Sequence, residues 1–275
     1  MSYAFPGEGA LDYFPCRYGA SRLLFRGPRR SLERPFIAIL GGTETYGKFV
    51  PKPFPDLVED EVGMSVVNLG CMNAGPDVFL NDPGIVEIAN RAQLTVLQLI
   101  GAINVSNRYY AVHPRRNDRF LHATPLLRAM FREVDFTEFS FTRHMLQALQ
   151  AVSPDRFEVL AEELRATWVE RMKLLLSRIT GRRVLFWMSE QPPPPPTGQA
   201  SLFGAPLLVD AEMVKALRDL ADDYVQHITT PNARDEGLSG KAFSPLEAPA
   251  AAGLPGPNAH REAALTLTTA LRRYI

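Results

Sequence analysis

Residues 36–47, FIAILGGTETYG, place a hydroxyl group where α/β proteins form ligand sites. Five apolar residues precede Gly41 and Gly42, and these are followed by Thr43, Thr45 and a further glycine. A short unbroken apolar run is typical of a buried parallel strand, and glycines directly after it allow a sharp turn whose amides face a ligand. We therefore expect Thr43 at the carboxyl end of the first strand, where open α/β sheets bind their ligands.

The Thr43 hydroxyl has two interpretations. It is a potential nucleophile if a histidine takes its proton and nearby amides hold the developing oxyanion, although its methyl group crowds the line of attack. It is equally a potential helix cap or ligand contact. His260, at the start of the last predicted helix, is a candidate base because an unperturbed imidazole has a pKa of about 6.5. A histidine at a helix start is also an ordinary surface residue, so both interpretations stay open.

Residues 104–119, which follow the third predicted strand, are polar and aromatic and long for a connection. Long loops after strands often carry function. The arginines here are planar bidentate donors that suit a phosphate, sulfate, carboxylate or sugar ligand. The alternative is a loop held by salt bridges to the acids around Asp135 and Glu138. His113 also competes with His260 as the base. The candidate ligand contacts in this loop are Asn107, Arg108, His113, Arg115 and Arg116.

The remaining elements must position these groups. Apolar runs predict strands at 36–40, 65–69, 95–100, 184–188 and 223–228, separated by segments with helical periodicity. Such alternation of strands and helices predicts parallel strands joined by right-handed crossover connections. The expected fold is an α/β three-layer sandwich with a mostly parallel five-stranded sheet.

The chain is expected to form one domain with two additions. Residues 1–35 are rich in proline and glycine and predict an irregular N-terminal arm, and residues 36–275 form the α/β domain. A helical insertion is expected at about 120–180, where Ser153 and Pro154 begin the longest predicted helix. The proline run 192–196 predicts a loop or lid on the side of the site, or else a segment that a proline-recognition partner binds.

Composition excludes several classes of protein. The chain has 275 residues, 46% of them hydrophobic. It has 30 Lys and Arg and 30 Asp and Glu, so no net positive charge attracts nucleic acid or an anionic membrane. Two cysteines are too few for a disulfide framework or a cysteine-built metal site. We expect no metal and no cofactor, because ligand spacings and a dinucleotide fingerprint are absent. No signal peptide or membrane span is predicted, so we expect a cytoplasmic protein.

Four short blocks resemble those of the GDSL, or SGNH, hydrolase superfamily. Residues 41–47 resemble its Gly-Asp-Ser-x-Thr-x-Gly block, and residues 68–70 (NLG) resemble the block whose glycine amide helps to hold an oxyanion. Residues 101–104 (GAIN) are similar to the Gly-x-Asn-Asp block with the asparagine displaced by one position. Residues 257–260 (PNAH) are similar to the block that carries the catalytic histidine.

The sequence departs from this family's pattern at three positions. Thr43 stands in place of the serine nucleophile, Gly42 in place of the adjacent aspartate, and Pro257 in place of the aspartate that orients the histidine. Segments 106–108, 112–119 and 138–144 also resemble an uncharacterised family of bacterial proteins, which we associate with alphaproteobacteria and which implies no activity.

Two functions are compatible with these features. The resemblance implies an SGNH-hydrolase-like, flavodoxin-like fold and an esterase or acyltransferase acting on a carbohydrate or another small acyl ester. In that case Thr43 is the nucleophile and His260 the base. The remaining implied site residues are Gly70 and Asn104 as oxyanion donors, with Gly42 and Thr45 beside the substrate. The alternative is a non-catalytic binding protein on the same fold that holds an anionic or sugar ligand. The oligomeric state stays open.

Overall fold

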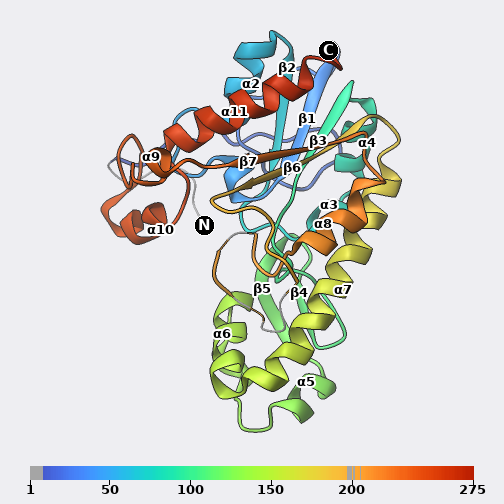
Figure 1. The fold of residues 1–275 in the computed structure, drawn as a ribbon, viewed down its shortest axis with the longest axis vertical. Helices are drawn as coiled ribbons and strands as arrows, with labels where there is room; N and C mark the ends of the chain where they lie inside the picture. The colour runs from blue at the N-terminus through green and yellow to red at the C-terminus, as the bar shows by residue number, and fades with distance from the viewer. Residues whose placement is uncertain (1–8, 197–199, 201, 205) are drawn as a thin grey trace.

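A five-stranded parallel sheet forms the centre of the molecule, as the computed structural model shows for residues 9–196, 200, 202–204 and 206–275 (Figure 1). The strands are β1 (Phe36–Gly41), β2 (Ser65–Gly70), β3 (Leu94–Gln98), β6 (Arg183–Ser189) and β7 (Asp223–Ile228). Their order is β2-β1-β3-β6-β7, and every neighbouring pair is parallel. This is the flavodoxin-like strand order, and it confirms the predicted α/β class.

Helices cover both faces of the sheet because its strands are apolar on both sides. Ile37 and Ile39 pack under α2 (Phe54–Val62) and α11 (Pro257–Leu271). Ala38 and Leu40 belong to the larger core on the opposite face. Helices α4 (Pro83–Arg91), α7 (Pro154–Arg178) and α8 (Ala211–Arg218) bury their apolar sides in that core. The alternation along β1 explains why its sequence is an unbroken apolar run.

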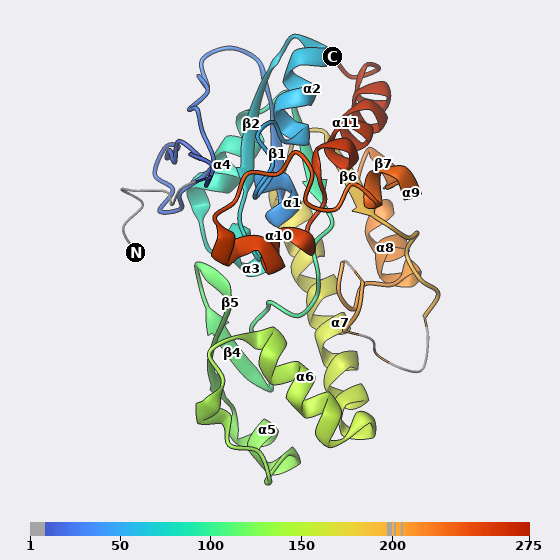
Figure 2. The same cartoon turned by 90° about the vertical axis from the view of Figure 1, so that its left-hand side faces the viewer.

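A second part of the structure projects from the sheet (Figure 2). It contains the antiparallel hairpin of β4 (Tyr110–His113) and β5 (Arg116–Ala123), followed by α5 (Pro125–Met130), η1 (Phe136–Glu138) and α6 (Thr142–Val152). Helix α7 begins here and runs back to the sheet, and the Ser153 hydroxyl caps it by accepting from the Arg156 amide, as predicted.

The hairpin corrects the prediction of a loop at 104–119. In β4, Tyr110 and Val112 are buried with the two-residue period of a strand, and Val112 pairs with buried Phe120 of β5, but the pairing is shifted twice along its length. Such shifts break the regular alternation of buried and exposed residues that sequence analysis detects. The short helix α1 (Thr43–Tyr46) follows β1 directly. Further short helices were not predicted: α3 (Pro76–Leu80), α9 (Pro231–Arg234), η2 (Pro245–Glu247) and α10 (Ala248–Ala252).

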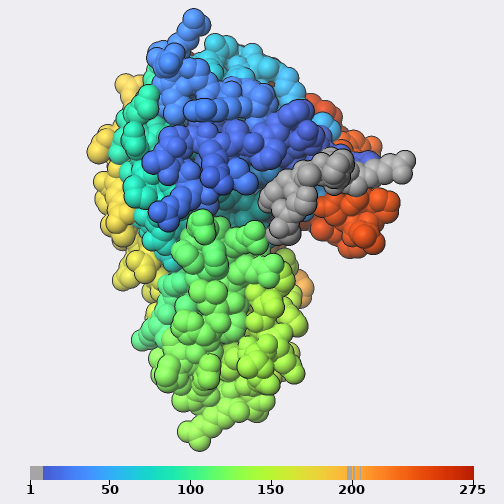
Figure 3. Space-filling model, turned by 180° about the vertical axis from the view of Figure 1, so that it is seen from behind, coloured from blue at the N-terminus to red at the C-terminus, as the bar shows by residue number. Residues whose placement is uncertain are grey.

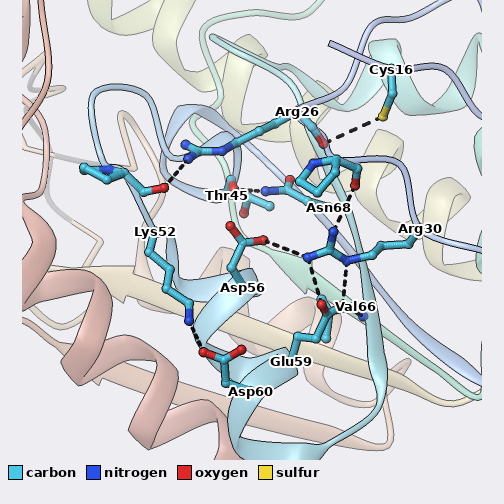
Figure 4. A network of polar contacts seen from close by, with 12 residues as sticks. Cys16, Arg26, Arg30, Thr45, Lys52, Asp56, Glu59, Asp60, Val66 and Asn68 are labelled. Atoms are coloured by element: carbon cyan, nitrogen blue, oxygen red, sulfur yellow. Dashed lines mark hydrogen bonds and ion pairs between the residues drawn. The ribbon is translucent and has the colours of Figure 1, made fainter. Parts of the chain in front are cut away.

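The described part of the N-terminal arm lies against the α/β core, as the view from behind shows (Figure 3). Arg26 is buried, and its guanidinium donates to the carbonyls of Gly47 at 2.6 Å and Pro51 at 2.7 Å. Arg30 pairs with Glu59 of α2 at 2.8 Å (Figure 4). The arm therefore fixes the segment that follows α1. In the described residues, no helix is both long and apolar enough to cross a membrane.

Candidate functional site

A cavity of about 1250 Å³ opens at the carboxyl ends of the strands. Gly42 and Thr43, just after β1, and Gln98, the last residue of β3, line it. The chain leaves β1 towards β2 on one side and later reaches β3 on the other. This reversal of strand order is the topological switch point, where open α/β sheets leave a crevice for ligands. The fold therefore places Thr43 where the sequence predicted.

The Thr43 hydroxyl bonds to the loop after β2. Its Oγ1 accepts a hydrogen bond from the backbone N–H of Asn73 at 2.9 Å, and it lies 3.4 Å from Oδ1 of the same residue. The cap of α1 is Gly42, which makes no side-chain capping bond. The expectation that Thr43 caps the helix is thus wrong, and the half-buried hydroxyl faces the cavity instead.

Asn73 connects the polar groups around Thr43. Its φ of 53° lies in the left-handed region, which asparagine adopts more readily than most residues. Its side-chain nitrogen donates to Oδ2 of Asp118 at 3.1 Å, and its carbonyl accepts from Nδ2 of Asn104 at 2.9 Å. Oδ1 of Asn104 in turn accepts from the Thr142 hydroxyl at 2.5 Å. Sequence reasoning missed Asn73 and Asp118; an asparagine shortly after the second strand was the available signal.

Gly70 does not present its amide to this site. The N–H of Gly70 donates to Oδ1 of Asn68 at 2.9 Å, and Gly70 does not line the cavity. The glycine is required for another reason, since a Cβ there would lie 2.2 Å from the backbone nitrogen of Tyr46. The amide that contacts the Thr43 hydroxyl belongs to Asn73, three residues later. The expected oxyanion role of Gly70 is therefore corrected.

Gln98 holds the turn after β1 from inside. Its Oε1 accepts from the Gly42 amide at 3.0 Å and from the Thr45 hydroxyl at 2.6 Å. Its Nε2 donates to Oε2 of Glu44 at 3.0 Å. Thr45 is completely buried, so it positions the turn and does not contact a ligand. Its carbonyl also accepts from the side-chain amide of Asn68 at 2.8 Å (Figure 4).

The structure does not support His260 as a base. The ring lies in the core, where Nδ1 accepts from the Phe54 amide at 3.0 Å and the imidazole stacks on the Phe54 ring with centroids 5.9 Å apart. Burial, and then the positive charges of Arg26 and Lys241, lower the pKa of His260 to about 3. With Nδ1 occupied, the neutral ring carries its hydrogen on Nε2 and keeps no lone pair for a hydroxyl proton. His260 also does not line the cavity.

The loop residues proposed as ligand contacts lie outside the cavity. Oδ1 of Asn107 accepts from the amides of Tyr109 and Tyr110, so this side chain shapes the turn. Arg108 forms an ion pair with Glu163 at 2.9 Å. A salt bridge therefore holds this loop, as the alternative interpretation expected, but the acid is Glu163 and not one of those around Asp135 and Glu138. His113 accepts from the Arg115 amide at the tip of the β4–β5 hairpin, where Arg115 and Arg116 are exposed. Of the predicted site residues, the cavity is lined by Thr43, Gly42 and Asn104.

The rest of the cavity wall comes from segments far apart in the sequence. Prolines 192–195 line it, which agrees with the interpretation of this run as a loop on the side of the site. Residues 252–256 and Lys241 line it from the C-terminal segment, and burial lowers the pKa of Lys241. His144 of α6 is the single histidine on this wall among the described residues. The described part of the chain contains no group of three or more His, Cys, Asp or Glu suited to a metal ion.

Residues 1–275 match the model of the family described as "Domain of unknown function (DUF6473)". The chain belongs to this family. No curated protein matches its sequence.

Solved structures with a similar arrangement include proteins described as esterases and lipases. A carbohydrate esterase family 2 enzyme with a carbohydrate-binding domain, from Corynascus thermopiles (Myceliophthora fergusii), is 12% identical with a TM-score of 0.44 over 90% of this chain and 69% of that chain. The lipase Lip_vut3 from a goat rumen metagenome is 11% identical with a TM-score of 0.47 over 86% and 97%. A putative lipolytic protein of the G-D-S-L family from Desulfitobacterium hafniense DCB-2 is 10% identical with a TM-score of 0.40 over 88% and 100%. Because the sequence identities and TM-scores are this low, we assign the fold from the strand order of this chain and not from these structures.

Proposed function

We propose that the chain binds a polar small molecule, of the sugar or anionic class, in the cavity at the carboxyl ends of the strands. The Thr43 hydroxyl is a ligand contact in this proposal. The observation that carries it is the arrangement at the cavity wall, where Thr43, Asn73 and Asn104 form one hydrogen-bonded set facing a space of about 1250 Å³. A cavity with a few convergent polar groups on its wall is the usual form of a small-molecule site.

We favour ligand binding over catalysis because His260, the expected base, does not line the cavity. A threonine hydroxyl needs a proton acceptor within hydrogen-bond reach before it attacks an acyl group. The hydrogen bonds of Thr43 go to the amide and side-chain oxygen of Asn73, and neither group takes up a proton at neutral pH. His260 is held in the core by Phe54.

The test is a thermal-shift screen followed by calorimetry. Neutral sugars, amino sugars and sugar phosphates are screened for stabilisation of the wild-type chain, and the affinity of each hit is measured for Thr43→Ala. Loss of one hydroxyl contact should weaken binding about tenfold, the equivalent of about 1.4 kcal/mol. Thr269→Ala is the matched control, because Thr269 is exposed on α11, its hydroxyl donates to the Leu265 carbonyl, and the residue does not line the cavity. A hit whose affinity does not change in Thr43→Ala would contradict the role of this hydroxyl.

The second candidate is an SGNH-like esterase or acyltransferase with Thr43 as the nucleophile. One observation favours it: the Asn73 N–H, which donates to the Thr43 hydroxyl at 2.9 Å, is a backbone donor next to the place where an attack by that hydroxyl would form an oxyanion. This reading requires a base other than His260, and His144 is the histidine that lines the cavity. The substrate would be a carbohydrate ester or another small acyl ester.

A fluorophosphonate probe separates the two candidates. Labelling that is lost in Thr43→Ala and kept in Thr43→Ser would favour acyl transfer, because serine retains the hydroxyl and removes the crowding methyl group. No labelling, combined with stabilisation by an unreactive ligand, would favour binding alone. Labelling that survives Thr43→Ala would exclude Thr43 as the nucleophile.

A further inference from the structure

Two carboxylates, those of Glu44 and Asp118, line the same cavity as Thr43. Glu44 follows Thr43 in α1, and Asp118 on β5 reaches the same place through Asn73. The bonded partner of each carboxylate is a neutral amide: Gln98 for Glu44 and Asn73 for Asp118. Across the described parts of the chain, no ion pair joins either carboxylate to a lysine or arginine. The polar end of the cavity is therefore acceptor-rich and carries negative charge that the protein does not neutralise.

Three cations that line the same cavity bond to groups other than Glu44 and Asp118. Arg165 pairs with Glu158 at 2.9 Å and Arg234 with Glu190 at 4.0 Å. The ammonium of Lys241 donates to backbone carbonyls of the 251–254 segment. Arg143 and His144 line the cavity from α6, and among the ion pairs of the described residues none joins them to Glu44 or Asp118. An anionic group placed beside Thr43 would thus meet two like charges, whereas a hydroxyl or ammonium group would donate to them.

A different part of the same cavity is apolar. Prolines 192–195 line the cavity without offering any N–H donor, and Leu207, Leu254 and Pro255 are further apolar residues of its lining. Apolar surface of this kind binds by excluding water and discriminates little among polar groups. The cavity therefore combines a polar end rich in acceptors with an apolar wall.

We infer that the ligand presents hydrogen-bond donors, hydroxyl or ammonium groups, to Glu44, Asp118 and Thr43, and places an apolar group against the proline wall. This inference rests on the proposed binding function and narrows it: it selects donor-bearing ligands over the anionic ones that the arginine-rich loop suggested. Charge-assisted hydrogen bonds to the carboxylates supply the selectivity.

Three probes that share a phenyl ring test the inference by calorimetry: phenyl β-glucoside, phenethylamine and phenyl phosphate. We expect the glucoside or the amine to bind the wild-type chain at least about tenfold more tightly than phenyl phosphate, the difference that one charge-assisted hydrogen bond provides. Glu44→Gln and Asp118→Asn keep the shape and one acceptor. Each should weaken the amine about tenfold and the glucoside less, which also distinguishes an ammonium from a hydroxyl ligand.

Glu61→Gln, an exposed carboxylate of α2, is the matched control and should leave all three affinities unchanged. Thermal unfolding of each variant verifies that it is folded. Phenyl phosphate binding as tightly as the other probes would overturn the inference and leave the proposed function intact. Failure of all three probes to bind the wild-type chain would overturn the proposed function and the inference with it. Unchanged affinity for the preferred probe in both Glu44→Gln and Asp118→Asn would overturn the assignment of the carboxylates.

Discussion

Replacing His260 by asparagine should remove an acid-sensitive part of the folding stability. The imidazole is 1% exposed, and its Nδ1 accepts from the Phe54 amide, which joins α11 to α2. Burial lowers the pKa of His260 to about 3. Asparagine at this position offers a side-chain oxygen to the same amide and does not titrate.

The size of the effect follows from the two pKa values. The unfolded chain binds a proton at His260 below a pKa of about 6.5, whereas the folded chain stays neutral until about pH 3. The unfolded state therefore gains protons first as the pH falls, and stability is lost at about 1.4 kcal/mol per pH unit between these limits. At pH 5 the loss attributable to His260 is about 2 kcal/mol relative to pH 8.

Urea unfolding at pH 8 and pH 5 measures this loss. The His260→Asn chain should be less stable than wild type at pH 8, because the stacking contact with Phe54 is gone. The difference in unfolding free energy should shrink by about 2 kcal/mol at pH 5, because the unfolded wild-type chain binds a proton at His260 there and asparagine does not titrate. His144→Asn, at an exposed position, should follow the wild-type pH dependence. Equal losses for wild type and His260→Asn between pH 8 and pH 5 would refute the assignment of a buried, neutral imidazole.

Two further changes test the elements that position the site. Arg26→Met should cost about 3 kcal/mol of folding stability in urea titration, because it removes two hydrogen bonds from a charged guanidinium, to the carbonyls of Gly47 and Pro51; a loss no greater than that of exposed Arg34→Met would contradict this. Gly75→Ala should prevent or strongly weaken folding, because its Cβ would lie 1.6 Å from the Asn104 carbonyl oxygen. Gly63→Ala, with a φ of 68° and no atom within 4 Å of its Cβ, should cost only about 1 kcal/mol, and equal melting temperatures for the two variants would count against the close approach at Gly75.

The sheet could be predicted from the sequence because each strand is a local apolar run flanked by turn residues. All five predicted strands occur within two residues of their expected ends, and the alternation with helices fixed their parallel direction. The position of Thr43 followed from the same local pattern, since the residue after a strand and two glycines must lie at the sheet's carboxyl edge. The capped start of α7 at Ser153 is local as well.

The direction in which individual polar groups point was decided only by the tertiary structure. The sequence places His260 near the start of a helix, as the structure does. Its ring faces the core because α11 packs on α2, and the amide of Phe54, the first residue of α2, needs an acceptor. Gly70 ends its strand as expected, yet its amide is taken by Asn68, and the left-handed conformation of Asn73 brings a different amide to Thr43. The bonds of His260 to Phe54 and of Asn73 to Thr43 join residues 206 and 30 positions apart, so no local spacing encodes them, and they form only when the layers are packed together.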